Sequence, residues 1–177
     1  MPYAESMAPR RLLTQIRLVL LFFAVALIAS GLTAIVPLQG LRMLAPIFAS
    51  GSAAARLWPA LAGWLNLVHH ALEDTYASYP FLAYGYDWLA FGHFIIAVPF
   101  LMAVRDPLRS TWVIPFGIAA CLLVLPHALI FGAVRGIPVF WRLVDALFGI
   151  GGLITLLFLR QRVRLLSVVE GSPSGRG

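Results

Sequence analysis

The sequence has few charged residues, no lysine and one cysteine. Only 11% of its 177 residues are charged, whereas 61% are hydrophobic. A soluble globular domain needs far more charged surface, so the composition excludes that class. The single cysteine, Cys121, excludes an internal disulfide and a cysteine-based metal site. No P-loop, G-x-G-x-x-G, G-x-S-x-G or H-E-x-x-H motif occurs, so nucleotide chemistry and the commonest hydrolase mechanisms lack support.

Four apolar stretches are each long enough to cross a bilayer, which takes about 20 residues. They cover about residues 18–36, 84–104, 111–134 and 139–159. Short links between the last three spans require antiparallel neighbours. The sequence therefore predicts an all-α polytopic protein in contact with the lipid bilayer. We expect one four-helix domain over residues 1–166 and a disordered tail over residues 167–177.

The 13 basic residues are all arginines, and the formal net charge is +6. They flank apolar stretches, which is typical of topology anchors and argues against nucleic acid as a partner. With four spans, one group falls on a single side of the membrane, which we expect to be the cytoplasm together with both termini. This group is Arg10, Arg11, Arg17, Arg105, Arg109, Arg160, Arg162 and Arg164, whereas Arg42, Arg56, Arg135 and Arg142 fall on the opposite side.

The first span has a second interpretation as a signal sequence. The stretch APRRLLTQIRLVLLFFAVALIASGLTA has a basic start, an apolar core and small residues near a possible cleavage point. Its apolar run continues through IVPL, however, and is long enough to span the membrane. We therefore expect an uncleaved first helix.

Residues 38–83 form the one sizeable segment outside the predicted spans. Within it, apolar residues recur at spacings of three and four. This pattern predicts an amphipathic helix that starts or is interrupted near Pro59 and either lies on the outer surface of the membrane or caps the bundle. The apolar face comprises Leu57, Leu61, Trp64, Leu65, Val68, Leu72, Tyr76 and Tyr79.

Several stretches carry a resemblance to a family. SGLTAIVPL, TYASYPFLAYGYDWLAFGHFIIA, RDPLRSTWVIPFGIAACLLVLP and RGIPVFWRLVDALFG together resemble an uncharacterised family of small bacterial membrane proteins with four spans. The resemblance covers most of residues 30–150. It implies the four-span fold and a location in the bacterial inner membrane, and it transfers no catalytic residue.

Ionisable residues within or beside the spans gather toward the outer half of the predicted bundle. Charges inside a membrane are costly and usually face protein or water. The simplest interpretation is structural, with Asp87 pairing with Arg135 or Arg142, and Asp145 pairing with Arg142 on its own helix. The candidate polar site consists of Asp87, His93, His127, Arg135, Arg142 and Asp145.

Two histidines support a sharper hypothesis. His93 and His127, at similar depth on adjacent helices, could bind a b-type haem through one ring nitrogen each. Pro126 would kink the helix and free a backbone carbonyl about one turn back. A proton path through both histidines and Asp145, or a quinone site, is the related alternative. Aromatic residues near the outer end could instead line a pocket for an amphiphile or form an interfacial belt.

The stretch HHALED, residues 69–74, suggests Zn²⁺ ligands at first sight. Adjacent histidines diverge by about 100° on a helix, so the four side chains cannot converge on one ion without a partner element. Contacts between residues four apart, His69 with Glu73 and His70 with Asp74, explain the pattern better. We predict no metal site and assign no catalytic residue.

The sequence as a whole favours a protein that acts without catalysis in the bacterial inner membrane. We expect an accessory or structural membrane subunit, or a protein that binds an amphiphilic ligand near the outer leaflet. Partners would be other membrane subunits or further copies of the chain, because small residues at four-residue intervals favour close helix packing. The alternative is a redox or proton-handling component that uses His93 and His127.

Overall fold

The computed structural model describes the backbone of residues 2–171 and the side chains of residues 9–168. Within that part of the chain every regular element is a helix, so the predicted all-α fold is confirmed. The elements are α1 (Pro2–Ile35), α2 (Pro37–Leu44), α3 (Ala53–Leu57), α4 (Pro59–Ser78), η1 (Pro80–Ala83), α5 (Tyr84–Arg105), α6 (Val113–Pro126), η2 (His127–Phe131), α7 (Gly132–Val134) and α8 (Val139–Gly171).

Four helical stretches are long and apolar enough to cross a membrane. They are Pro9–Ile35, Pro80–Arg105, Val113–Val134 and Val139–Val168. In lipid, backbone N–H and C=O groups must find partners within the protein, and a helix satisfies them internally. The chain is therefore a polytopic membrane protein, as its sequence predicts.

Two helices extend well beyond the predicted spans. Helix α1 begins at Pro2, and α8 continues to Gly171, so the helix includes residues 167–171 of the predicted tail. Arginine and leucine are good helix formers, so a helix does not have to end where its apolar segment ends. Residues 172–177, the rest of that tail, lie outside the described residues.

The chain divides into two compact units, which we describe separately. Unit 1 comprises Met1–Val25 and Ala97–Gly177, and unit 2 comprises Ala26–Ile96. Helices α1 and α5 each contribute to both units. The single domain expected over residues 1–166 stays a prediction.

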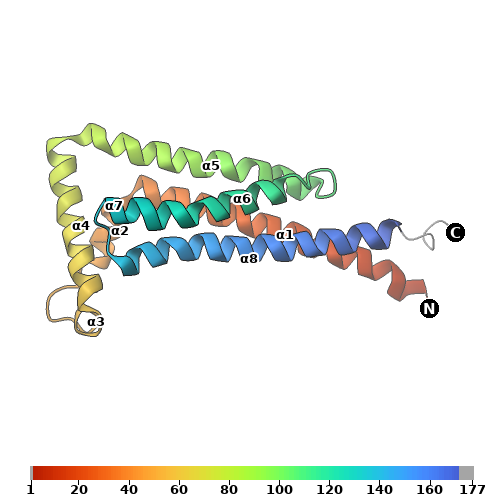
Figure 1. Cartoon of the computed structure of the whole chain (residues 1–177), viewed down its shortest axis with the longest axis horizontal. Helices are drawn as coiled ribbons and strands as arrows, with labels where there is room; N and C mark the ends of the chain where they lie inside the picture. Colours follow the sequence, from red (N-terminus) through yellow and green to blue (C-terminus); the bar gives the residue numbers. More distant parts are fainter. Residues whose placement is uncertain (1, 172–177) are drawn as a thin grey trace. The chain divides into compact units, whose positions relative to one another are not determined.

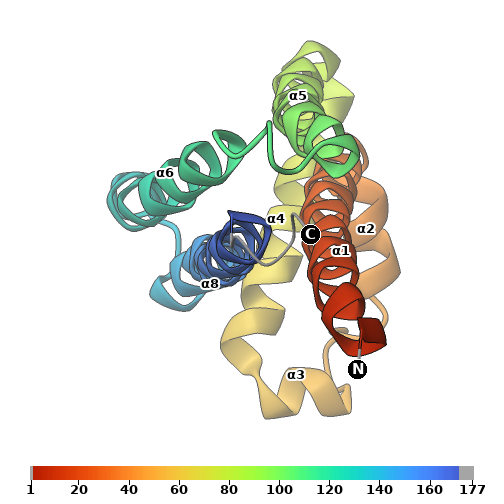
Figure 2. The ribbon, with the colours of Figure 1, turned by 90° about the vertical axis from the view of Figure 1, so that its right-hand side faces the viewer.

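In unit 1, α6 lies side by side with α8, which extends beyond it (Figures 1 and 2). Glycines on α8 permit this close approach. A Cβ at Gly149 would lie 2.9 Å from the backbone oxygen of Cys121, and one at Gly152 would lie 2.7 Å from its Sγ. Cys121 is therefore a buried packing residue on α6, where it faces glycines.

Aromatic and aliphatic side chains fill the rest of the unit 1 core. Phe100 of α5 is fully buried, and its ring centroid lies 4.5 Å from that of Phe23 on α1. Gly117 of α6 leaves room for Phe100, because a Cβ there would lie 2.8 Å from its ring. The buried residues of α1, Ile16, Leu20 and Ala24, are spaced by four, as expected for one helix face.

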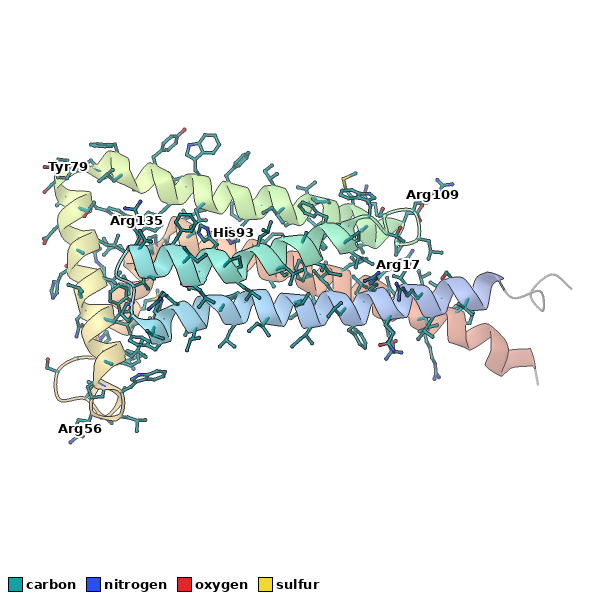
Figure 3. The ribbon with its side chains drawn as sticks, in the orientation of Figure 1. Arg17, Arg56, Tyr79, His93, Arg109 and Arg135 are labelled. Carbon is teal, nitrogen blue, oxygen red and sulfur yellow. The ribbon has the colours of Figure 1, made fainter. Side chains whose placement is uncertain are left out.

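The arginines of unit 1 divide between its two ends. Figure 3 shows Arg17 and Arg109 at one end and Arg135 at the other. At the first end, the Arg17 guanidinium donates to the backbone oxygen of Arg105 at 3.4 Å. Asp106 shapes the nearby link, because its carboxylate accepts from the backbone N–H of Arg109 at 3.3 Å. We call this end, which also carries Arg160, Arg162 and Arg164 of α8, the arginine-rich end.

In unit 2, α4 runs across the direction of the first half of α5 (Figure 1). Helix α4 starts at Pro59, as predicted, because proline suits the first helical position. It ends at Ser78, shortly before Pro80. Leu57 of the predicted apolar face belongs instead to the short helix α3 and is 88% exposed.

The remaining contacts of unit 2 bring α1 close to α5. A Cβ at Gly31 of α1 would lie 3.1 Å from both the backbone oxygen of Ala90 and the Cβ of His93. Because Gly31 has no side chain, the backbone of α1 can lie against Ala90 and His93 of α5. His93 consequently lies at a close helix crossing within unit 2.

Two glycines on α8 provide a test of the α6–α8 packing. Gly149→Ala places a methyl group against the backbone of Cys121, which cannot move without shifting α6. We expect the free energy of unfolding to fall by about 1–3 kcal/mol. Gly151→Ala is the matched control, because nothing lies within 4 Å of a Cβ there. Thermal unfolding of the purified protein in mild detergent measures both, and equal midpoints for the two variants would contradict the predicted close contact.

Candidate functional site

The six predicted site residues belong to both units. Asp87 and His93 lie on the part of α5 that belongs to unit 2. The other four, His127, Arg135, Arg142 and Asp145, lie in unit 1, on η2, after α7 and on α8. The structure therefore defines the contacts of each residue within its own unit.

His93 has a defined tautomer. Its Nδ1 lies 2.8 Å from the backbone oxygen of Leu89, one turn earlier on α5. A carbonyl oxygen only accepts hydrogen bonds, so Nδ1 carries the proton and donates. The other nitrogen, Nε2, then has a lone pair that can accept a hydrogen bond or bind a metal. The ring is half-buried at the contact with Gly31.

Asp87 lies in the first turn of α5 and is exposed. A carboxylate there interacts favourably with the partial positive charge of the helix N-terminus, which typically contributes about 0.3–1 kcal/mol. This role requires no arginine partner. The predicted pairing of Asp87 with Arg135 or Arg142 would join the two units and stays a prediction.

Arg135 and Gly136 end the third span in a defined cap. Gly136 has a φ of +71°, a conformation that favours glycine. Its N–H donates to Ala133, and the next N–H, of Ile137, donates to Gly132 at 2.8 Å. This pair of bonds is a Schellman motif. The exposed Arg135 therefore lies at a helix C-terminus, where a cation is favourable.

Pro126 distorts the third span, as the sequence predicts. The five residues that follow it, His127–Phe131, form a π-helical turn, η2, between α6 and α7. Proline lacks an N–H and so cannot donate to the carbonyl four residues before it. Wide turns of this kind are rare and occur frequently at functional sites.

Arg142 of α8 reaches this distorted segment. Its guanidinium donates to the backbone oxygen of Leu129 at 3.3 Å. The stem of the side chain lies against Gly132, where a Cβ would be only 2.6 Å from Cγ and Cδ of Arg142. The wide turn and the glycine together give a cation on α8 access to a backbone carbonyl of the neighbouring span.

Asp145 does not form the expected ion pair with Arg142. The two residues lie three apart on α8, yet no ion pair joins them among the described side chains. Arg142 is directed at Leu129 instead, because the π-helical turn after Pro126 leaves a backbone carbonyl that can accept a second hydrogen bond. Asp145 is left half-buried on the first part of α8.

His127 is exposed on η2. Its ring lies against Phe131, with 5.0 Å between the ring centroids. Large apolar side chains on the same span are exposed around it, including Leu123, Ile130 and Phe131. A single imidazole therefore lies on an otherwise apolar membrane-spanning surface.

Helix α4 carries a separate polar cluster. Glu73 accepts a hydrogen bond from Arg42 of α2 at 3.1 Å, and its Oε1 lies 3.5 Å from Nε2 of His69. The contact between His69 and Glu73 confirms the expected spacing of four. No group of three or more histidine, cysteine or acidic residues in the described part of the chain could hold a metal ion. These residues connect α2 to α4, and the exposed ion pair contributes less than about 1 kcal/mol.

The sequence pattern assigns Tyr76 to the apolar face of α4, but its side chain also carries a polar hydroxyl group. Its hydroxyl is buried and has no hydrogen-bond partner among the described residues. Burial, followed by the nearby Tyr86 and Asp87, raises the pKa of Tyr76 above its usual value. The folded protein therefore favours the neutral phenol. The free energy of unfolding should fall only as the pH rises above about 10, where the unfolded chain begins to lose this proton more readily than the folded one.

Comparisons with models of protein families, with curated proteins and with solved structures find no match. The resemblance to small bacterial proteins with four spans therefore stays a prediction.

Asp145 and Arg142 allow a direct test of these contacts. Arg142→Ala removes the hydrogen bond to Leu129 and the packing over Gly132, and we expect the free energy of unfolding to fall by about 1.5–3 kcal/mol. Asp145→Asn, on the same helix turn, should change it by less than about 0.5 kcal/mol. Denaturant unfolding in detergent measures both. If Asp145→Asn costs as much as Arg142→Ala, and the double variant costs no more, the two residues form the ion pair after all.

Proposed function

We propose that the chain is a non-enzymatic accessory subunit that associates with another integral membrane protein through the surface around His127. The exposed imidazole on η2 is the observation that carries this proposal. An ionisable group inside a membrane usually faces protein or water, because facing lipid is costly. The surrounding exposed residues, such as Leu123 and Phe131, fit an apolar contact with a partner helix.

The partner would supply a hydrogen-bonding group at the level of His127. Serine, threonine and backbone carbonyls commonly serve this purpose between membrane helices, at about 0.6–2 kcal/mol for each bond. The glycines of α6 and α7 already have packing partners within unit 1, because Gly117 contacts Phe100 and Gly132 contacts Arg142. The surface around His127 is thus better suited to a second chain than these glycines are.

Native mass spectrometry after extraction in mild detergent tests this role. We expect the wild-type chain to be released in a complex with a second integral membrane protein. His127→Leu should lose that protein while the isolated chain keeps its unfolding temperature. His70→Leu, a change at an exposed histidine outside the spans, is the control. A complex that survives His127→Leu, or one made only of copies of this chain, would contradict the proposal.

A membrane redox or proton-handling component is a second candidate, and the geometry of His93 favours it. A metal-binding histidine usually donates its other ring N–H to a carbonyl or carboxylate, as Nδ1 of His93 does to Leu89. In this case Nε2 of His93 would bind a b-type haem or border a quinone. The same mass spectrum would then contain the mass of the cofactor, and a haem would add a Soret band to the absorbance spectrum.

We also propose that the protein resides in the inner membrane of a bacterium, with both termini in the cytoplasm. Support comes from the arginine-rich end of unit 1, toward which both Arg17 and Arg109 lie (Figure 3). Positively charged residues are enriched on the cytoplasmic side of membrane proteins.

Reporter fusions test this orientation. Green fluorescent protein fused after residue 168 should fluoresce, and alkaline phosphatase fused there should be inactive, because each folds only on its own side of the membrane. Fusions within the link between α2 and α3 should show the reverse pattern. An active phosphatase at residue 168 would place the arginine-rich end outside.

A further inference from the structure

A cavity of about 560 Å³ lies at the arginine-rich end of unit 1. One wall is formed by the link before α6 and the first turn of α6, and the other by the last part of α8. Leu108, Ile114, Pro115 and Val163 supply an apolar lining. Binding sites for small molecules commonly have volumes of about 300–1,000 Å³, so the cavity can hold a headgroup and part of a chain.

Two arginines of α8 line the same cavity. Arg160 and Arg164 are separated by four residues, so their side chains share one face of the helix. No acidic residue lines the cavity, and neither arginine forms an ion pair with a described side chain. Like charges at this spacing repel each other. An anion between them would convert that repulsion into two attractive contacts.

The remaining polar groups of the cavity agree with a phosphate as the anion. The Thr111 hydroxyl can donate to a phosphate oxygen, as can the guanidinium groups. The Ser167 hydroxyl donates to the backbone oxygen of Arg164 at 2.8 Å and is therefore already used. Nearby Trp112 is exposed next to the cavity wall, as is typical of residues at the level of lipid headgroups.

A second groove of unit 1 provides a contrast. Its volume is about 400 Å³, and it is lined by Leu18, Val19, Phe22, Ile154, Thr155 and Phe158. It contains no charged residue, so it offers contacts to an acyl chain and none to an acidic headgroup. Of these two sites, the cavity at Arg160 and Arg164 is the one that joins an apolar wall to paired cations.

We infer that this cavity binds an anionic glycerophospholipid, with its phosphate between Arg160 and Arg164 and an acyl chain along Ile114 and Val163. The lipid comes from the leaflet at the arginine-rich end. Basic pockets between membrane helices recognise acidic headgroups in this way, through charge and an adjoining apolar wall. This inference concerns a different surface from the one around His127 and does not depend on the proposed partner.

Native mass spectrometry of the delipidated full chain, titrated with phosphatidylglycerol or with phosphatidylcholine of the same acyl chains, tests the inference. The wild-type protein should bind phosphatidylglycerol more tightly than phosphatidylcholine. Arg160→Gln or Arg164→Gln should each weaken phosphatidylglycerol about fivefold, and the double variant about 25-fold, with phosphatidylcholine unchanged. The single variants keep the test valid if the double variant does not fold.

Arg162→Gln is the matched control for lost charge. Arg162 lies on the same helix between the two arginines, but its guanidinium lies over the ring of Phe158, 4.6 Å from the ring centroid. The Arg162→Gln variant should bind phosphatidylglycerol as tightly as the wild type does. Leu108→Trp fills part of the cavity without removing charge and should weaken phosphatidylglycerol as well.

Three outcomes would overturn the inference. Equal losses for Arg162→Gln and Arg160→Gln would indicate attraction to the surface as a whole. Unchanged binding in Leu108→Trp would place the lipid elsewhere. Displacement of phosphatidylglycerol by inorganic phosphate at similar concentrations would show that the cavity takes a free anion and makes no use of an acyl chain.

Discussion

The close approach of α6 and α8 is the constraint on which unit 1 depends. Gly149 and Gly152 leave no side chain between α8 and Cys121, so the two backbones nearly touch midway along the pair. At one end this approach allows the Arg142 guanidinium to reach the carbonyl of Leu129. At the other end it places Arg160 and Arg164 opposite the start of α6. A larger side chain in the middle would alter both ends.

Several charged residues have roles that arise from helix ends alone. Asp87 lies in the first turn of α5, and Arg135 follows the last turn of α7. Each position matches the sign of the helix dipole, so neither residue requires a partner charge. A group of charges near one end of predicted spans is therefore weak evidence for a binding site. His127 differs, because it lies on an exposed apolar surface within a span and away from a helix terminus.

Hydrogen bonds to backbone carbonyls recur where the polar side chains of this protein meet the membrane-spanning helices. His93 donates to Leu89, Arg142 to Leu129 and Thr155 to Gly151. In a low-dielectric environment an unpaired polar group is costly, and the nearest acceptor is usually a backbone oxygen. Pro126 widens the helix at η2, and Gly132 leaves space beside it for the guanidinium of Arg142. These interactions depend on the local shape of the backbone. Matching opposite charges along the sequence therefore does not predict them.

The sequence by itself determined the helical fold, the four spans and the start of α4 at Pro59, because apolar run length and proline chemistry act locally along the chain. It also indicated the distortion after Pro126. Only the tertiary structure decided that Arg142 contacts Leu129 and forms no ion pair with Asp145, and that Tyr76 has a buried hydroxyl. Only it revealed a cavity beside Arg160 and Arg164. These features depend on the distance between helices, which close contacts of glycines set and which spacing along the sequence does not encode.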